Sequence, residues 1–154
     1  MIADPATRIL VIADTHNRLP PKVLALAENV NEIWHLGDVC ASPILDELRL
    51  LGPPLTIVRG NCDSDFEWPL TLELTRKGRR FRLQHIPPSS RQMPANCNVL
   101  LHGHTHVPRD ETIGDVRFLN PGCVTRPNRG APASVAFLTI RNNGELEWQL
   151  QYLS

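Results

Sequence analysis

Carboxylate, imidazole and amide side chains directly follow the strands that the apolar pattern of this chain predicts. All six histidines lie in or beside these strand ends, whereas histidines with a purely structural role would be scattered. Imidazole nitrogens mixed with carboxylate and amide oxygens suit divalent ions such as Mn²⁺, Fe²⁺, Co²⁺ or Zn²⁺. The donors exceed what one ion needs, so we expect two ions, and two ions about 3.5–4 Å apart stabilise the attacking and leaving oxygens of a phosphoryl transfer. The polar segments are Asp14–His16, His35–Asp38, Gly60–Asp63, Gln84–His85 and His102–His106.

Apolar runs in the first part of the chain predict the sheet that would position these groups. The continuous apolar run over 8–13 is typical of a strand that is buried on both faces. Further strands are predicted at 32–36 and 55–58, and helical spacing predicts helices at 20–30 and 43–51 between them. Ser42 is expected to cap the second helix. This βαβαβ order favours a parallel sheet with crossover helices, and ligands bind such a sheet outside the carboxyl ends of its strands.

The rest of the chain alternates apolar and polar residues, which predicts hairpins and short strands. The strongest turn signal is Asn143-Gly144. The Pro/Ser-rich segment 87–94 is expected to be a loop. The predicted strands are 70–74 and 80–84 around Lys77-Gly78, then 99–101, 116–119, 134–140 and 146–150.

Length and composition indicate one soluble domain over residues 1–154. Hydrophobic residues make up 42% and charged residues 21% of the chain, which is ordinary for a globular protein. Sixteen basic residues balance sixteen acidic ones, so we expect no nucleic-acid or membrane-surface binding. No apolar stretch approaches the ~20 residues of a membrane span, and no signal peptide is expected at the start. A cytoplasmic protein with reduced thiols is therefore expected; its cysteines are Cys40, Cys62, Cys97 and Cys123.

Five segments, taken in order, resemble the motifs of the calcineurin-like metallophosphoesterase superfamily. The resemblance runs from about residue 8 to residue 140, and the Gly-Asn-Cys-Asp sequence is similar to that of its small phosphodiesterases of the YfcE type. It implies an α/β fold, a four-layer α/β/β/α sandwich of two mixed β-sheets flanked by helices. The segments are Asp14–His16, Gly37-Asp38, Gly60–Asp63, Gly103–His106 and Asn120–Gly122.

The same resemblance implies a role for each predicted ligand. Asp38 would bridge the two ions, and a water held between them would attack the phosphorus. Asp38, Asn61 and Asp14 would be the residues closest to the reaction. The first ion would be held by Asp14, His16 and His106, and the second by Asn61, His85 and His104.

Three features of the chain depart from the pattern of the family. Cys62 stands where many members carry a histidine that protonates the leaving group, and a thiol is a weak donor. His85 is followed by Ile86, where the family usually has a glycine that tolerates positive φ. The segment after Ile86 is short and contains Pro87, Pro88 and Pro94, so we expect no helix there and an open site.

Other polar residues near the predicted ligands have more than one interpretation. Asp63 could bind a ligand or cap a turn, and Cys62 could be a small packed residue. His35 and His102 are expected to support the ligands rather than to bind an ion. Arg126 and Arg129 are expected to be solvated, although either could contact a substrate phosphate. The tryptophans Trp34, Trp68 and Trp148 are expected in the core or at an interface.

The sequence thus predicts a metal-dependent phosphodiesterase that acts on a small phosphoester, with two divalent ions. Manganese is the expected metal, with Fe, Ni, Co or Zn as alternatives. A homodimer is possible through exposed sheet edges. The alternatives are a phosphomonoesterase or phosphoprotein phosphatase, and a protein-binding scaffold like the relative of this family in the retromer coat.

Overall fold

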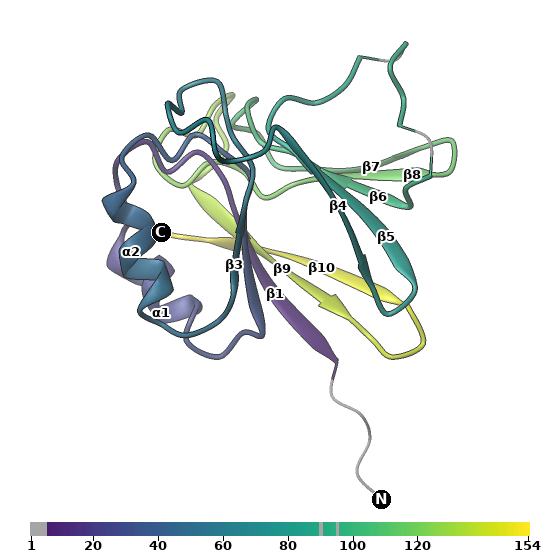
Figure 1. Ribbon diagram of the computed structural model, residues 1–154, viewed down its shortest axis with the longest axis horizontal. Helices are drawn as coiled ribbons and strands as arrows, with labels where there is room; N and C mark the ends of the chain where they lie inside the picture. Colours follow the sequence, from purple (N-terminus) through teal and green to yellow (C-terminus); the bar gives the residue numbers. More distant parts are fainter. Residues whose placement is uncertain (1–5, 90, 95) are drawn as a thin grey trace, which may run out of the picture.

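The computed structural model describes residues 6–89, 91–94 and 96–154, and it contains two five-stranded mixed sheets (Figure 1). The first sheet has the order β10-β9-β1-β2-β3, and β1 runs parallel to β2 but antiparallel to β9. Its strands are β1 (Thr7–Ile12), β2 (Glu32–His35), β3 (Leu55–Ile57), β9 (Ser134–Ile140) and β10 (Leu146–Tyr152). The second sheet has the order β4-β5-β6-β8-β7. Its strands are β4 (Thr71–Arg76), β5 (Arg79–Gln84), β6 (Val99–Leu101), β7 (Arg109–Ile113) and β8 (Val116–Asn120).

Strand β1 is buried on both faces, which explains its continuous apolar run. Ile9 and Val11 face the second sheet in the core that also contains Trp34, Phe81 and Leu101. Leu10 and Ile12 face the helices on the other side. The two helices, α1 (Pro21–Leu26) and α2 (Pro43–Arg49), cover this outer face with Val23, Ile44, Leu45 and Leu48.

The outer face of the second sheet is covered by a loop where the family resemblance implies a helix. Leu100 and Phe118 are buried there, and Met93 and Cys97 of the loop pack against them. The described residues between β5 and β6 include no helix, as the prolines of segment 87–94 predict. The predicted α/β sandwich of two mixed sheets with flanking helices is confirmed, and its helices lie on one outer face of the described chain.

Three local predictions need correction. The first helix is shorter than predicted, because Asn31 is tied to Arg8 of β1 by two hydrogen bonds of 2.8 Å and the chain must leave the helix before that point. Ser42 stands before α2, but its side chain makes no capping hydrogen bond. Strand β7 was missed because its residues are mostly exposed and lack apolar alternation. None of the helices in the described part of the chain is long and apolar enough to span a membrane.

Candidate metal centre

The predicted ligands come together at one end of the sandwich, where the loops after the parallel strands gather (Figure 1). Asp14 follows β1, Asp38 follows β2, and Asn61 lies in the loop after β3. From the second sheet, His85 follows β5 directly, and the loop after β6 carries His104 and His106. The two sheets therefore supply complementary halves of one site.

The residues predicted for the first ion surround the Asp14 carboxylate. Ligand atoms of Asp14, His16, Asp38 and His106 all lie within 4.8 Å of one another. Asp14 Oδ1 is 3.4 Å from His106 Nε2 and 3.8 Å from His16 Nε2. Asp38 Oδ2 is 3.7 Å from His16 Nε2. Both carboxylates thus face His16 Nε2, and Asp14 also faces His106 Nε2.

The residues predicted for the second ion meet the first group through His85. His85 Nε2 is 3.2 Å from Asp38 Oδ2 and 3.7 Å from Asp14 Oδ1. The rings of His85 and His104 are in edge-to-face contact with centroids 5.3 Å apart. His104 Nδ1 is 3.1 Å from Asn61 Oδ1. The structure therefore brings all seven predicted ligands into one cluster, in which Asp38 lies between the two sets.

Two buried polar atoms in this cluster have no hydrogen-bond partner among the residues that the structure describes, and this tests whether a metal fits. They are Asp14 Oδ1 and His85 Nε2. An unsatisfied buried polar group costs about 1–3 kcal/mol, and more for a charged group. A cation between the carboxylates and the imidazoles would satisfy both atoms, and the mixed N and O donors suit a divalent transition metal. The residues therefore fit the metal site predicted from the sequence.

Hydrogen bonds on the outer side of two imidazoles orient their inner nitrogens. His85 Nδ1 is 2.8 Å from the carbonyl oxygen of Leu36, and His106 Nδ1 is 2.6 Å from that of Arg126. Each Nδ1–H donates to its carbonyl, so the neutral ring directs the Nε2 lone pair into the cluster. This tautomer is the one that metal ligation requires.

The two aspartates have opposite pKa shifts. Burial raises the pKa of Asp14 to about 6, although the charges of His85 and His106 oppose the shift. Burial also acts to raise the pKa of Asp38, but the His85 imidazole 3.2 Å from its Oδ2, the hydrogen bond from the Cys62 N–H and the charge of His16 lower it to about 2. Burial lowers the pKa of His85, and the two aspartates outweigh this effect and raise it. Asp14 is therefore the carboxylate that gains most from a cation.

The ligand loops adopt backbone conformations that non-glycine residues rarely occupy. Positive φ angles occur at Asp14 (58°), His16 (45°), Asp38 (58°), His104 (71°) and His106 (62°). Such conformations cost about 1–3 kcal/mol each and cluster at functional sites. Gly60 is needed because a Cβ there would collide with the Asp38 carboxylate. Close packing of these loops thus sets the positions of the ligands.

Asp63 orders this end of the molecule through the main chain. Its Oδ2 accepts hydrogen bonds from the N–H groups of Asp38 (2.9 Å) and Gly60 (2.7 Å), and its Oδ1 accepts from Cys40 N–H (2.8 Å). Both carboxylate oxygens are engaged with backbone groups. Asp63 therefore caps the turn at Gly60 and ties it to the Asp38 loop, which decides between the two interpretations of the sequence.

His35 and His102 lie away from the ligand cluster. Buried His35 accepts the Gly37 N–H at Nδ1 (3.1 Å), and its Nε2 lies 3.0 Å from Thr15 Oγ1. Burial lowers its pKa to about 3. His102 lies between the carbonyl oxygen of Gly103 (2.9 Å) and Arg109 Nη1 (3.1 Å), and burial lowers its pKa to about 4. Both are neutral residues that hold the ligand loops.

The supporting roles of two residues were not predicted from the sequence, although one of them, Asn120, belongs to a named motif. The Asn120 side chain donates hydrogen bonds to the Gly103 carbonyl (3.3 Å) and to Thr105 Oγ1 (3.0 Å). These bonds fix the loop after β6, which carries His104 and His106. The thiol of Cys40 is 3.7 Å from His16 Nδ1, on the side of the ring opposite the cluster. Asn120 could have been found from its place in the Asn-Pro-Gly motif, but nothing in the sequence signals the contact of Cys40.

The remaining candidates are peripheral or structural. Cys62 is exposed, and burial and the nearby Asp38 raise the pKa of its thiol. Arg126 and Arg129 are exposed, as expected. Cys123 is buried and Cys97 is half-buried. The tryptophans pack in or against the cores: Trp34 and Trp148 between the sheets, and Trp68 on the helix side.

Most of the chain is similar in sequence to known proteins. Residues 7–143 match the calcineurin-like phosphoesterase superfamily domain. The chain is 31% identical to phosphodiesterase YfcE of Escherichia coli K12 over 85% of this chain and 86% of that protein. It is also 31% identical to a probable metallophosphoesterase of Methanothermobacter thermautotrophicus, over 88% of this chain and 86% of that protein.

Solved structures share the fold. The structure of Yfce, a phosphoesterase from E. coli, matches 96% of this chain and 100% of its own with a TM-score of 0.75 at 24% identity. Vps29 of Entamoeba histolytica complexed with Zn²⁺ matches 96% of this chain and 100% of its own with a TM-score of 0.76 at 21% identity. At these identities the likeness concerns the architecture alone.

Proposed function

The chain belongs to the calcineurin-like phosphoesterase superfamily, and we propose that it is a metal-dependent phosphodiesterase that works with two divalent ions, manganese first among them. The observation that carries the proposal is the pair of unpartnered buried atoms, Asp14 Oδ1 and His85 Nε2, which face each other across the ligand cluster at 3.7 Å. The folded chain keeps this arrangement at a cost in stability, and a cation removes that cost.

The ligand set divides into two groups around Asp38. Asp14, His16 and His106 would hold the first ion, Asn61, His85 and His104 would hold the second, and Asp38 would contact both. When bound, the two ions supply Lewis-acid stabilisation of phosphoryl charge and lower the pKa of a water molecule to near neutrality.

The residues of the chain orient these groups and set their charge. The two aspartates supply negative charge inside the cluster, and the Nδ1 hydrogen bonds of His85 and His106 keep both rings aimed inward. The Asp63 carboxylate holds the N–H of Asp38 and so fixes the bridging position. These contacts pre-organise the site before substrate binds, which is where most of the electrostatic contribution to catalysis originates.

No acid for the leaving group is evident at Cys62. Its thiol has a raised pKa, and a thiol is a weak donor. Leaving groups that depart without protonation, such as aryl oxides, should therefore react fastest. As substrates, diesters with a good leaving group should therefore be preferred to alkyl phosphomonoesters and protein phosphates.

Turnover of the metal-reconstituted protein tests the proposal directly. The chain is stripped with a chelator, titrated with Mn²⁺ by calorimetry, and assayed with bis(4-nitrophenyl) phosphate and 4-nitrophenyl phosphate. We expect two bound ions per chain and a higher kcat/KM for the diester. Asp38→Asn should abolish turnover and weaken both ions, whereas Asp46→Asn, on the exposed side of α2, should change neither.

Other outcomes would support the alternatives. A higher kcat/KM for the monoester would indicate a phosphomonoesterase. Tight ions without turnover of either ester, or no ions at all, would favour a protein-binding scaffold. Cytoplasmic location, a homodimer and the lack of a nucleic-acid partner stay predictions.

A further inference from the structure

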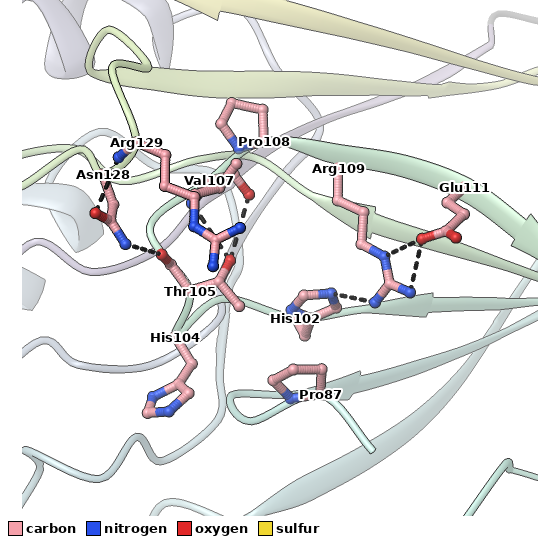
Figure 2. A pocket seen from close by; sticks show the side chains of 10 residues that line it. All are labelled: Pro87, His102, His104, Thr105, Val107, Pro108, Arg109, Glu111, Asn128 and Arg129. Atoms are coloured by element: carbon pink, nitrogen blue, oxygen red, sulfur yellow. Dashed lines mark hydrogen bonds and ion pairs between the residues drawn. The ribbon is translucent and has the colours of Figure 1, made fainter. Parts of the chain in front are cut away.

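Two cavities of different character flank the candidate metal centre. The larger one, of about 620 Å³, lies beside His104 and is drawn in Figure 2. The smaller one, of about 200 Å³, lies beside Asn61 and His85. Cavities of about 300–1,000 Å³ hold small organic ligands, so the larger one has room for a substituent of considerable size. The smaller one has room for a single ring.

The predicted ligands of the second ion join the two cavities. Asn61 lines the small cavity and His104 lines the large one, and Asn61 Oδ1 is 3.1 Å from His104 Nδ1. The chain after β5 separates the cavities, because His85 and Ile86 line the small one and Pro87 lines the large one. A phosphorus atom held at the ligand cluster would therefore lie next to both cavities.

The larger cavity combines apolar walls with one uncompensated cation. Arg109 is fixed by Glu111 (2.9 Å) and by a hydrogen bond to His102 (3.1 Å). The guanidinium of Arg129 makes no hydrogen bond or ion pair with the described residues, and Arg129 lines the cavity together with Thr105 and Val107 (Figure 2). Its backbone is held by the Asn128 side chain (2.9 Å) and has φ of 53°. Arg129 is thus presented to this cavity with its charge available for an anion.

The smaller cavity is apolar at its mouth. Leu70 is 58% exposed and Ile86 is 51% exposed, and both line the cavity. Exposed aliphatic side chains beside a polar ligand cluster offer a surface for an aromatic or aliphatic group. Ile86 is also the residue that replaces the usual glycine of the family, so this surface is a property of the present chain.

We propose that the substrate is an unsymmetrical phosphodiester whose apolar substituent occupies the Leu70–Ile86 cavity and whose larger substituent carries a second anion bound by Arg129. This inference rests on the proposed function and specifies its substrate class. A phosphomonoester has a single organic substituent on phosphorus, so it could occupy only one of the two cavities.

Two diesters that differ by one charged group provide the test. The probes are the 4-nitrophenyl ester of thymidine 5′-phosphate and the same compound with a 3′-phosphate, which share the scissile bond and the leaving group. With Mn²⁺ we expect the 3′-phosphorylated probe to have about tenfold higher kcat/KM, the factor that one charge-assisted hydrogen bond contributes at a solvent-facing site. Arg129→Ala should remove this preference and change the other probe less than about twofold. Arg141→Ala, on the exposed closing hairpin, should leave the preference intact.

The apolar half of the proposal has its own variant. Leu70→Asp should raise KM for both probes about fivefold without altering their ratio, and Leu50→Asp, at a residue that is 87% exposed and outside both cavities, should have no effect. Any of three results would overturn the inference while leaving the phosphodiesterase assignment in place. The first is an equal kcat/KM for the two probes in the wild-type protein. The others are an equal loss of kcat/KM for both probes in Arg129→Ala and an unchanged KM in Leu70→Asp. If the wild-type protein hydrolyses neither probe nor bis(4-nitrophenyl) phosphate, the proposed function itself fails, and the inference fails with it.

Discussion

Replacing Asp14 with asparagine should make the metal-free protein more stable and the metal-loaded protein less stable. Asp14 is fully buried. Within the described part of the chain its Oδ1 has no hydrogen-bond partner, and its Oδ2 accepts one hydrogen bond, of 3.3 Å, from His104 N–H. An asparagine oxygen can keep this hydrogen bond, and its NH₂ can donate to His106 Nε2, which is 3.4 Å from Oδ1. The substitution therefore removes a buried charge without leaving a new unsatisfied group.

The size of the effect follows from the pKa of Asp14. Burial raises that pKa from 3.8 to about 6, and each pH unit is equivalent to 1.36 kcal/mol, so the ionised carboxylate costs about 3 kcal/mol at pH 7. The native state binds more protons than the unfolded state between pH 3.8 and 6, so this cost grows as pH rises through that window. Below the lower value both states are protonated and the cost disappears.

Urea unfolding in chelator measures the difference between the two proteins. At pH 7 the variant should be about 3 kcal/mol more stable than the wild type, and the gap should shrink to under about 1 kcal/mol at pH 4. With Mn²⁺ at about a thousand times its dissociation constant, the wild type should gain about 4 kcal/mol that the variant lacks, and the order should reverse. A variant that is less stable than the wild type in chelator at pH 7, or a gap that does not change with pH, would refute the reasoning.

Three further predictions concern the residues around the ligands. Asp63→Ala should lower the free energy of unfolding in chelator by about 3 kcal/mol, because three main-chain N–H groups lose their acceptor. An unchanged free energy of unfolding together with lost metal affinity would instead indicate that Asp63 is a metal ligand. When the pH is lowered from 7 to 5 in chelator, the free energy of unfolding should fall by about 2 kcal/mol more in the wild type than in His35→Asn. The reason is that His35 has a pKa of about 3 in the folded state and about 6.5 when unfolded, so the unfolded state gains the proton. Parallel pH profiles of the two proteins would contradict this. Cys62→Ala should change kcat/KM for bis(4-nitrophenyl) phosphate by less than about tenfold, whereas a loss beyond about a hundredfold, the typical contribution of a general acid, would show that the thiol donates a proton.

The fold was predictable where burial left a periodic signal. The apolar run that became β1 and the alternation around Asn143-Gly144 indicated the correct elements, because the core selects residues of one kind at fixed spacing. Strand β7 left no such signal: it is an edge strand whose side chains are mostly exposed, and its pairing with β8 depends on backbone hydrogen bonds and on the ion pair of Arg117 with Asp110 (2.8 Å). Edge strands of this kind are determined by their partners more than by their own sequence.

The candidate site was predictable as a set of residues but not as a set of roles. The ends of parallel strands in one sheet meet at one edge, so the clustering of Asp14 and Asp38 followed from their positions in the chain. His85 follows β5 of the second sheet, so the family resemblance rather than this rule placed it with them. The role of Asp63 did not follow from its position, because its three hydrogen bonds go to main-chain groups, which every residue type carries. His102 was expected to support the ligands rather than to bind an ion, and the structure shows why it lies apart from His104 and His106. The loop leaves extended geometry at the positive φ of His104 (71°), so the alternation of the three histidines in sequence does not place them on one face.

Ile86 replaces the usual glycine of the family without displacing the neighbouring ligand, His85. A glycine-only backbone conformation at this position would have been incompatible with isoleucine, yet Ile86 is not among the described residues with positive φ. His85 is nevertheless buried, and its Nδ1 is held by the Leu36 carbonyl at 2.8 Å. The constraint on the ligand therefore comes from β2 and its loop rather than from the residue that follows it. Ile86 is therefore free to face outward, where it forms one wall of the smaller cavity. The residue that departs from the family pattern thus supplies the apolar surface from which a substrate preference is inferred.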